Sequence, residues 1–481
     1  MQLFVTQRIL GLLLISFSLT LLPPLGVSLW YEDEGLMPLM QAFLVMFGVG
    51  VVFWFPVRKV KKELHLHDGF VITAVFWTVL SIVGALPFLF ISDLTPAQAI
   101  FEAVSGFTTT GATVITGLDD WPKSILYYRQ QLQWLGGLGI IVLAVAVLPM
   151  LGIGGMQLYR AETPGPMRDE KLTPRLENTA KTLLYIYIVL TIACALAYWM
   201  AGMSLFDAIG HSYSTVATGG FSTHDASLGY YNSALIEVIA MVFIILGSLN
   251  FTVHFVVMRK MDMRHYWYDI QGRVFIYIVL VLIAITVIVL MWKGVYTEFW
   301  AALRYGSFAV ISIISSTGYA TADFSSWPLF LPVLILGSGF IGGCVGSTAG
   351  GFRVIRVILL YKQALREIMR LIHPNAVIAV KIGNQKISDS VAQAVWGFIF
   401  LYMASYILLS LLFLATGVDE VTAFSGIAAT LNMTGPGLGQ VAVTYEHISD
   451  AGLWILSFAM LLARLEIFTL LVLLTPAFWK R

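Results

Sequence analysis

The chain has 481 residues, of which 58% are hydrophobic and only 11% are charged, whereas a soluble domain carries roughly 25% charged residues. Several apolar runs are longer than the roughly 20 residues that cross a hydrocarbon core about 30 Å thick. The composition excludes a soluble globular protein and predicts an all-α integral membrane protein. The net charge of +1 excludes no class of membrane protein. Cys194 and Cys344 lie far apart in the sequence, so a disulfide framework is not expected.

The first apolar stretch, residues 4–29, contains Arg8 ahead of a long hydrophobic run and could be read as a secretory signal. We predict a retained helix instead, because no A-x-A cleavage site follows and a second apolar stretch begins near Leu36. From here to the C-terminus, apolar length and periodicity predict about ten membrane-spanning helices. Their expected ranges are 4–28, 36–57, 70–91, 124–151, 180–202, 231–258, 273–292, 327–361, 391–416 and 451–478.

Basic residues gather in alternate connections between these stretches. They are Arg58, Lys59, Lys61 and Lys62, then Arg160, Arg168, Lys171, Arg175 and Lys181, then Arg259, Lys260, Arg264 and Arg273, and finally the Lys and Arg residues of 353–386. The intervening connections carry acidic residues such as Asp93, Asp225 and Asp419. Because Lys and Arg accumulate in cytoplasmic loops, the basic connections and both termini are expected to be cytoplasmic.

Four segments on the expected outer side are too apolar for plain loops and too short to cross the membrane. They are Pro96–Gly117, Leu205–Asp225, Glu298–Asp323 and Asp419–Gln440. Each begins as a half helix and ends at a glycine followed by a polar return; the aligned glycines are Gly111, Gly220, Gly318 and Gly435. The pattern predicts four tandem helix, pore-loop, helix repeats around one pore, at 66–155, 176–262, 270–372 and 388–481, after an N-terminal helix pair at 1–65.

A half helix that returns as extended chain leaves backbone carbonyls without helical partners, which is tolerated only where the segment is buried in protein or lines an aqueous cavity. Carbonyls around a common axis can replace the hydration shell of a cation. Glycine permits the positive φ angles and close approach that this requires. Alternatively each glycine only closes a turn, but four matched positions favour a cation selectivity filter. The neighbouring hydroxyl and amide side chains either complete coordination or bond the loop backbone.

The motifs FTTTGAT, ATGGFST, SSTGYAT and NMTGPG closely resemble the four filter segments of the TrkH/KtrB superfamily of bacterial potassium transporters. The resemblance covers essentially the whole chain, and the N-terminal helix pair is similar to the TrkH branch. It implies K⁺ and Rb⁺ translocation across a bacterial inner membrane through a gated, glycine-based filter. Related plant transporters that prefer Na⁺ carry serine at the first filter glycine, so Gly111 indicates K⁺.

The resemblance also implies the filter residues and the partners. The filter residues are Thr110, Gly111, Ala112, Thr218, Gly219, Gly220, Thr317, Gly318, Tyr319, Asn432, Thr434 and Gly435. The expected K⁺ ligands among them are Thr110, Gly111, Gly219, Gly220, Thr317, Gly318, Thr434 and Gly435. The superfamily further implies a homodimer with one pore per protomer and a cytosolic ring of TrkA, a nucleotide-binding regulatory protein. The basic connections either dock this partner or only fix the topology.

Two features predict a gate on the cytoplasmic side of the filter. Arg464 lies in mid-span, where a lone cation costs about 2.5–3.5 kcal/mol and needs a partner or water. The glycine-rich stretch Gly342–Gly351 breaks the eighth predicted helix, and the resemblance implies an obstructing loop with Gly346, Ser347, Thr348 and Ala349 at its tip. The alternatives are an ion pair of Arg464 with Glu466 or a carbonyl, and close helix packing of the small residues.

The remaining motifs do not indicate an enzyme. Gly337, Gly339 and Gly342 satisfy G-x-G-x-x-G but end a membrane span rather than join a strand to a helix, and no organic cofactor is expected. The alternative function is a secondary transporter that couples K⁺ uptake to Na⁺ or H⁺, for which Glu466 is the candidate acidic residue. Glu102 and His211 lie on the half helices and are expected to brace the filter from behind.

Overall fold

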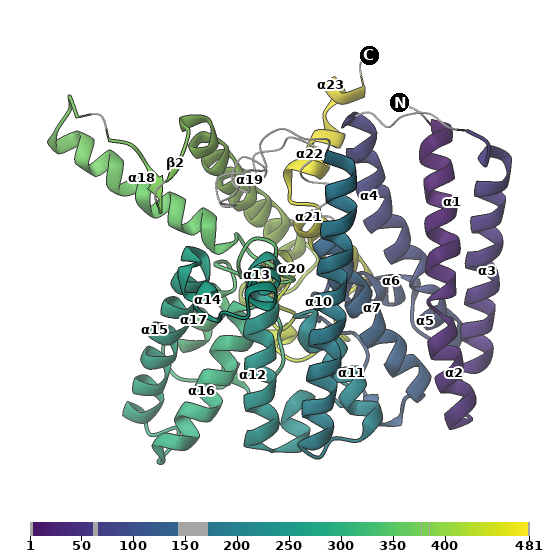
Figure 1. Ribbon diagram of the computed structural model, residues 1–481. Helices are drawn as coiled ribbons and strands as arrows, with labels where there is room; N and C mark the ends of the chain where they lie inside the picture. The colour runs from purple at the N-terminus through teal and green to yellow at the C-terminus, as the bar shows by residue number, and fades with distance from the viewer. Residues whose placement is uncertain (1–2, 61–65, 143–171, 377, 384, 480–481) are drawn as a thin grey trace.

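The computed structural model describes residues 3–60, 66–142, 172–376, 378–383 and 385–479. Secondary structure in these ranges is helical apart from one antiparallel hairpin, β1 Lys381–Ile382 and β2 Gln385–Lys386, in agreement with the predicted class. Helix α23, Pro476–Trp479, and the start of α1 lie at the same end of the molecule (Figure 1). The expected end of the fourth span, 143–151, and the basic residues Lys61, Lys62, Arg160, Arg168 and Lys171 lie outside the described residues.

Helices α1 Leu3–Leu19, α2 Leu22–Tyr31 and α3 Leu36–Trp54 form the N-terminal pair, in which α1 and α2 together make one span. The pair stands at one side of the molecule (Figure 1). A Cβ on Gly11 or on Gly50 would lie closer than 3.0 Å to atoms of the opposite helix. Glycines therefore let α1 and α3 approach closely, which strengthens van der Waals packing where lipid supplies no hydrophobic driving force.

Each of the four predicted repeats, called repeats 1 to 4 below, contains a short helix that ends near the middle of the fold. Repeat 1 contains α4 Leu66–Val83, α5 Leu86–Ile91, α6 Pro96–Phe107 and α7 Lys123–Val142. Repeat 2 contains α10 Leu172–Met200, α11 Leu205–Val216, α12 Ala234–Ser248 and α13 Phe251–Lys260, followed by α14 Arg264–Tyr268. Repeat 3 contains α15 Ile270–Trp292, α16 Phe299–Ile314, α17 Leu331–Ser338 and α18 Val354–Ile372. Repeat 4 contains α19 Asp389–Leu414, α20 Glu420–Leu431, α21 Asp450–Arg464 and α22 Phe468–Leu474.

We call α6, α11, α16 and α20 the pore helices; they match the four half helices predicted from the sequence. Three of them begin at a side-chain cap, with Thr95, Ser204 and Asp419 each accepting from a backbone N–H of the first turn. Such a cap satisfies donors that would otherwise be unpaired. Glu298, before α16, makes no such bond. A short 3₁₀ turn follows each filter segment: η2 Leu118–Asp120, η4 Ser227–Tyr231, η5 Phe324–Ser326 and η6 Gly439–Val441.

Three repeats have a broken second helix. Among the described residues six helices are long and apolar enough to cross a membrane, or seven if the bent pair α12 and α13 counts as one span. These two helices meet at 100°, and the α21 to α22 junction contains Glu466 and Ile467 with positive φ angles. The ranges 231–258 and 451–478 are thus interrupted, where the sequence predicted continuous helices. The count of ten spans remains a prediction.

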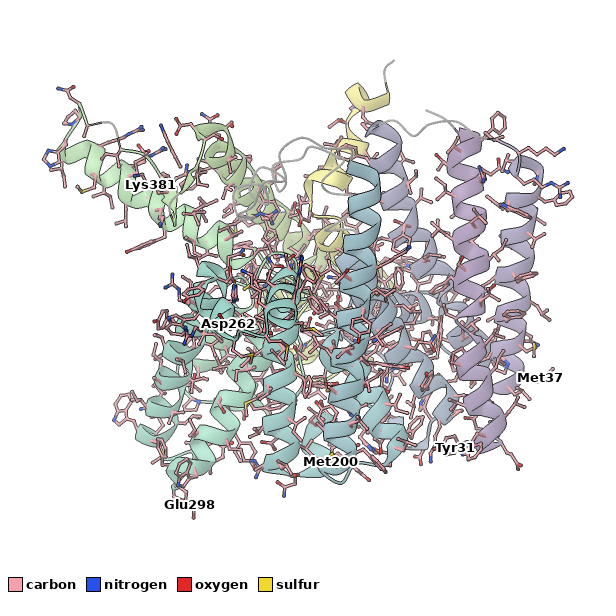
Figure 2. The ribbon with its side chains drawn as sticks, in the orientation of Figure 1. Tyr31, Met37, Met200, Asp262, Glu298 and Lys381 are labelled. Atoms are coloured by element: carbon pink, nitrogen blue, oxygen red, sulfur yellow. The ribbon has the colours of Figure 1, made fainter. Side chains whose placement is uncertain are left out.

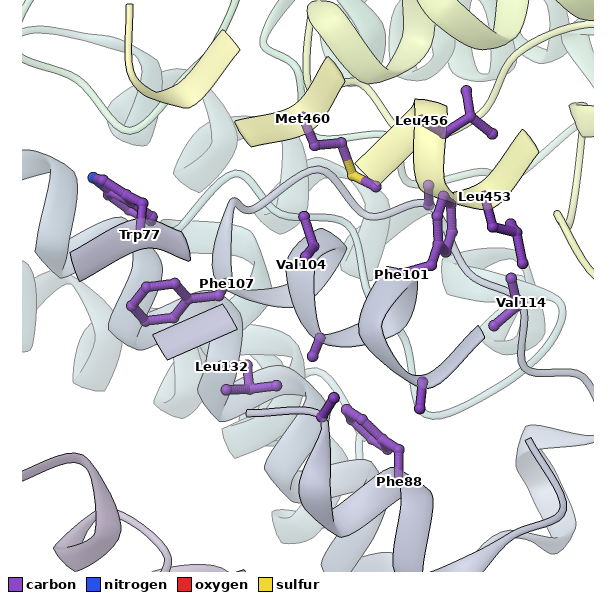
Figure 3. Packing of buried hydrophobic residues seen from close by; sticks show 14 of the residues in the cluster. Trp77, Phe88, Phe101, Val104, Phe107, Val114, Leu132, Leu453, Leu456 and Met460 are labelled. Carbon is purple, nitrogen blue, oxygen red and sulfur yellow. The ribbon is translucent and has the colours of Figure 1, made fainter. Parts of the chain in front are cut away.

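Pore helix α6 packs between the last repeat and the first. Its residues Phe101, Val104 and Phe107 lie between α21, which contributes Leu453 and Met460, and helices α4 and α7 (Figure 3). This contact brings the C-terminal repeat against the N-terminal one and closes the circle of repeats. At the periphery, Tyr31, Met200 and Glu298 mark the end opposite the termini, and Lys381 marks the terminal end (Figure 2).

Candidate functional site

The four segments predicted to form the filter, called the filter segments below, all leave their pore helices through the same turn. The backbone N–H of the residue before each predicted filter glycine donates to a pore-helix carbonyl at 2.8 Å in all four repeats. The pairs are Thr110 to Ser105, Gly219 to Ser214, Thr317 to Ser312 and Thr434 to Ala429. Four segments with different sequences thus adopt one backbone conformation.

The backbone dihedral angles repeat in the same way. The glycines Gly111, Gly220, Gly318 and Gly435 have φ angles of 82°, 80°, 80° and 81°. The residues two positions earlier are also left-handed: Thr109, Thr218, Ser316 and Met433 have φ angles of 59°, 50°, 59° and 58°. A positive φ is uncommon for residues that carry a side chain. Such strained backbone conformations cluster at functional sites. We call these four residues the deep rim, because they lie where the chain turns back from the pore helices.

The four filter glycines form a closed ring. A Cβ on Gly111 would lie closer than 3.0 Å to the carbonyl oxygen of Gly219 in the next repeat, and the same holds for Gly220 with Thr317, Gly318 with Thr434, and Gly435 with Thr110. Each glycine therefore faces the carbonyl that precedes the glycine of the following repeat. The last repeat meets the first, so the predicted residues surround a single axis.

The hydroxyl groups beside the glycines bond the loops themselves. The Oγ1 atoms of Thr108 and Thr110 lie 2.8 Å apart, and Ser315 and Thr317 pair at the same distance. The Thr434 hydroxyl donates to the Ala429 carbonyl at 3.3 Å. Of the two roles open at the sequence level, loop support is the one seen in these contacts, so backbone carbonyls are the stronger candidate ligands.

A buried ion pair braces the first filter segment from behind. Arg129 on α7 contacts Glu102 on α6 at 2.7 Å, with 1% and 0% of the two side chains exposed. Glu102 also accepts from Thr113 Oγ1 and the Val114 N–H, both at 3.0 Å. Arg129 donates in addition to the Ser222 carbonyl of repeat 2 at 3.2 Å. His211 likewise contacts Ser222 Oγ at 2.9 Å. Both half-helix residues therefore contact the chain that follows a predicted filter glycine, Glu102 in repeat 1 and His211 in repeat 2.

Arg464 ends helix α21 and points at the deep rim. Its Nη2 donates to Thr109 Oγ1 at 2.8 Å and its Nη1 lies 3.4 Å from the Met433 sulfur. The alternative of an ion pair with Glu466 is wrong, because Glu466 pairs with Arg356 at 3.0 Å. Arg464 is buried, so its charge lies directly beneath two of the four filter segments.

The predicted obstructing loop lies beneath the other two segments. Thr348 is bonded to Thr218 Oγ1 at 3.1 Å and to the Gly247 carbonyl at 3.1 Å, and the Gly350 N–H donates to Ser316 Oγ at 2.6 Å. The Ser347 hydroxyl stays within the loop on the Cys344 carbonyl, and the Gly346 carbonyl accepts from the Phe251 N–H. Ala349 is fully buried. Arg464 and this loop together contact all four residues of the deep rim.

Three residues that contact or form part of the filter segments were not predicted from the sequence. Met433 is apolar and has no chemical signature, so only its left-handed backbone places it in the deep rim. Arg129 and Gln133 lie on α7 and are buried. A basic residue within a predicted membrane span is a functional signal, and Arg129 could have been found by that criterion.

Comparison with known proteins agrees with this architecture. The sequence matches the TrkH family, described as cation transport proteins, over residues 35–481. Trk system potassium uptake protein TrkH of Halomonas elongata is 53% identical, over 100% of both chains. TrkH of Escherichia coli K12 is 50% identical, over 98% of both. The crystal structure of the potassium transporter TrkH from Vibrio parahaemolyticus superposes with a TM-score of 0.93 at 49% identity, over 100% of both chains. The chain therefore belongs to the TrkH family of cation transport proteins.

Proposed function

We propose that the chain conducts K⁺, and with it Rb⁺, across a bacterial inner membrane as the pore of a Trk potassium uptake system. The ring of four glycines, each facing a carbonyl of the next repeat, is the observation that supports this most directly. Backbone carbonyls around an axis can replace the water shell of K⁺. The relatives are named as potassium uptake proteins, which favours K⁺ as the permeant cation.

The proposed ligands are the carbonyl oxygens of the filter ring: Thr110, Gly111, Gly219, Gly220, Thr317, Gly318, Thr434 and Gly435. The C-terminal ends of the four pore helices direct partial negative charge toward them. The four filter motifs contain no carboxylate. Neutral oxygens bind a cation weakly enough to release it, which conduction requires.

Arg464 and the tip Gly346–Ala349 form the proposed gate. Both contact the deep rim, so a cation leaving the filter on that side meets a fixed positive charge and a packed loop. Conduction requires both to move. Because the loop docks on the carbonyls of Gly247 and Ser248 at the break of α12, such movement would involve repeats 2 and 3 together.

We assign the terminal end of the molecule to the cytoplasm. Basic residues such as Lys381, at that end (Figure 2), agree with the positive-inside rule. The relatives' names describe a Trk system, so this end is the proposed docking face for a TrkA-type nucleotide-binding subunit, and the functional unit is proposed to be a homodimer. Co-purification with and without that subunit, followed by mass measurement of the complex, tests both assignments.

Tracer Rb⁺ uptake into proteoliposomes tests the proposed function. We expect uptake that follows the Rb⁺ electrochemical gradient and is unchanged by opposing Na⁺ or pH gradients. Uptake that depends on a Na⁺ or H⁺ gradient would instead establish coupled transport. Absence of Rb⁺ flux from correctly folded protein would refute the proposal.

The filter assignment is tested by Gly111→Ser. A Cβ at this position meets the Gly219 carbonyl, so we expect the K⁺ to Na⁺ permeability ratio to fall by roughly tenfold, the factor that corresponds to about 1.4 kcal/mol. Gly117→Ser is the matched control, because Gly117 is also left-handed but has open space around it. An unchanged ratio in Gly111→Ser would remove Gly111 from the filter.

A further inference from the structure

One filter segment differs from the other three in the residue before its glycine. Repeats 1, 3 and 4 have threonine there, namely Thr110, Thr317 and Thr434, whereas repeat 2 has Gly219. The threonine hydroxyls bond groups of their own repeats, as described above. Repeat 2 therefore lacks a side chain that supports the filter in every other repeat.

The side chain of Gln133 fills the space of the missing threonine. A Cβ on Gly219 would lie closer than 3.0 Å to the Cδ, Oε1 and Nε2 atoms of Gln133. Gln133 belongs to α7, the second helix of repeat 1, and its side chain is fully buried. Thus a residue of one repeat occupies the position that the neighbouring repeat leaves empty.

Gln133 also bonds the filter backbone on both sides of Gly220. Its Nε2 donates to the Gly219 carbonyl at 2.6 Å, and its Oε1 accepts from the Phe221 N–H at 3.1 Å. One donor and one acceptor are matched to a carbonyl and an N–H, so only one orientation of the amide satisfies both. The bonds fix the direction of the Gly219 carbonyl, which is the group that faces Gly111 in the ring.

We infer that Gln133 is a positioning residue for cation selection, which replaces the threonine of the second filter segment and sets the Gly219 carbonyl. The inference rests on the proposed function, because it requires the glycine ring to be the filter. It adds a determinant that lies outside all four filter segments. The geometry of the second segment is thereby controlled from the first repeat.

The first test replaces Gln133 with leucine, which has similar volume and neither hydrogen bond. We expect the K⁺ to Na⁺ permeability ratio in proteoliposomes to fall by roughly fivefold, because two buried backbone bonds are lost. Gln131→Leu is the matched control: Gln131 lies on the same helix, is also buried, and bonds the Thr20 carbonyl at 2.6 Å away from the filter. The control should keep the wild-type ratio.

A second test restores the threonine that the other repeats have. Gly219→Thr alone should lose selectivity, since its Cβ collides with Gln133. Gly219 is not among the residues with positive φ, so threonine suits its backbone once space is made. The double variant Gly219→Thr/Gln133→Ala should therefore recover the wild-type ratio to within about twofold, a difference smaller than one typical hydrogen bond.

The outcomes separate this inference from the filter proposal. A normal ratio in Gln133→Leu together with a lowered ratio in Gly111→Ser would overturn the inference and leave the filter in place. A normal ratio in both variants would overturn the filter proposal itself. If Gln133→Leu does not fold, the double variant decides: recovery supports the inference, and a folded double variant as unselective as Gly219→Thr contradicts it.

Discussion

Arg464 is a buried cation that donates to a hydroxyl, lies beside a thioether and sits over the Trp77 ring, 5.2 Å from its centroid. A positive charge held in this way lies at the deep rim, where it opposes cation passage. Arg464→Ala should therefore raise Rb⁺ flux, by roughly tenfold if the barrier falls by about 1.4 kcal/mol. Arg464→Lys keeps the charge and should raise flux much less. Equal flux in both variants would show that packing, not charge, forms the barrier.

His224 joins the outer loops of repeats 1 and 2. It contacts Asp119 directly, lies 3.7 Å from Asp207, and stacks on Tyr230 with ring centroids 3.6 Å apart. Burial lowers the pKa of His224, but the nearby carboxylates of Asp207 and Asp119, the second of which is hydrogen-bonded to it, outweigh burial and raise the pKa above its ordinary value. The stabilising ion pairs are thus complete below the ordinary histidine pKa and are lost as pH rises through the raised value.

We therefore predict that the advantage of wild type over His224→Phe, which keeps the aromatic stacking, shrinks as pH rises from about 5 to about 9. Thermal unfolding midpoints of the two proteins across this range measure it. At the acid end, the pKa of Asp207 is lowered below its ordinary value despite burial, through hydrogen bonds that include His224, so Asp207 remains ionised. An advantage that grew with pH would contradict the raised pKa of His224.

At the residue scale the sequence predicted four matched glycines with a left-handed backbone, a conformation that glycine adopts freely. Gly111, Gly220, Gly318 and Gly435 all have that conformation. The residues two positions earlier also have a left-handed backbone, but nothing in the residue types of Thr109 and Met433 predicts it. Contacts across repeats, such as Gln133 with Gly219, depend on packing of segments far apart in the chain and leave no local pattern.

Among the elements, the pore helices and the break within 327–361 were predicted from the sequence, whereas the breaks after α12 and α21 were not. The break of α12 falls at Leu249 and Asn250, in a sequence that stays apolar on both sides. Asn250 caps α13 through the Thr252 N–H at 2.8 Å. The freed carbonyls of Gly247 and Ser248 accept from Thr348 and Cys344. The break is tolerated because the loop of another repeat donates hydrogen bonds to these free carbonyls. Irregular backbone at membrane depth must have its polar groups paired in this way.

The loop is held by hydrogen bonds that a conservative substitution can remove. Thr348→Val keeps the volume but loses the hydroxyl that contacts Thr218 Oγ1 and the Gly247 carbonyl. We expect a few-fold rise in Rb⁺ flux with an unchanged K⁺ to Na⁺ ratio, since loosening the loop by about 1 kcal/mol leaves the glycine ring intact. Thr416→Val, just after α19, removes a hydroxyl that donates to the Phe413 carbonyl far from the loop and should have no effect. A changed ratio in Thr348→Val would mean that the loop shapes the filter itself.

For the whole molecule, the closed ring depends on contacts that join residues of different repeats. The Tyr445 N–H of repeat 4 donates to the Thr113 carbonyl of repeat 1 at 2.8 Å, and its hydroxyl donates to the Gly435 carbonyl at 2.7 Å. Between repeats 2 and 3, Arg304 pairs with Glu237 at 2.7 Å. Tandem similarity in the sequence predicted four units, but not which side chains join them.

Arg129 links the first two predicted repeats, because it pairs with Glu102 of its own repeat and donates to the Ser222 carbonyl of the next. Arg129→Met leaves Glu102 buried without its cation, so we expect the protein to lose about 3–5 kcal/mol of stability. Adding Glu102→Gln removes the stranded charge and should recover part of that loss. Thermal unfolding of both single variants and the double variant in detergent measures the interaction energy.

Because Arg129 also holds the Ser222 carbonyl of repeat 2, the double variant should stay less selective for K⁺ than wild type even where its stability recovers. Additive losses in the three variants would show that the two side chains act independently of each other.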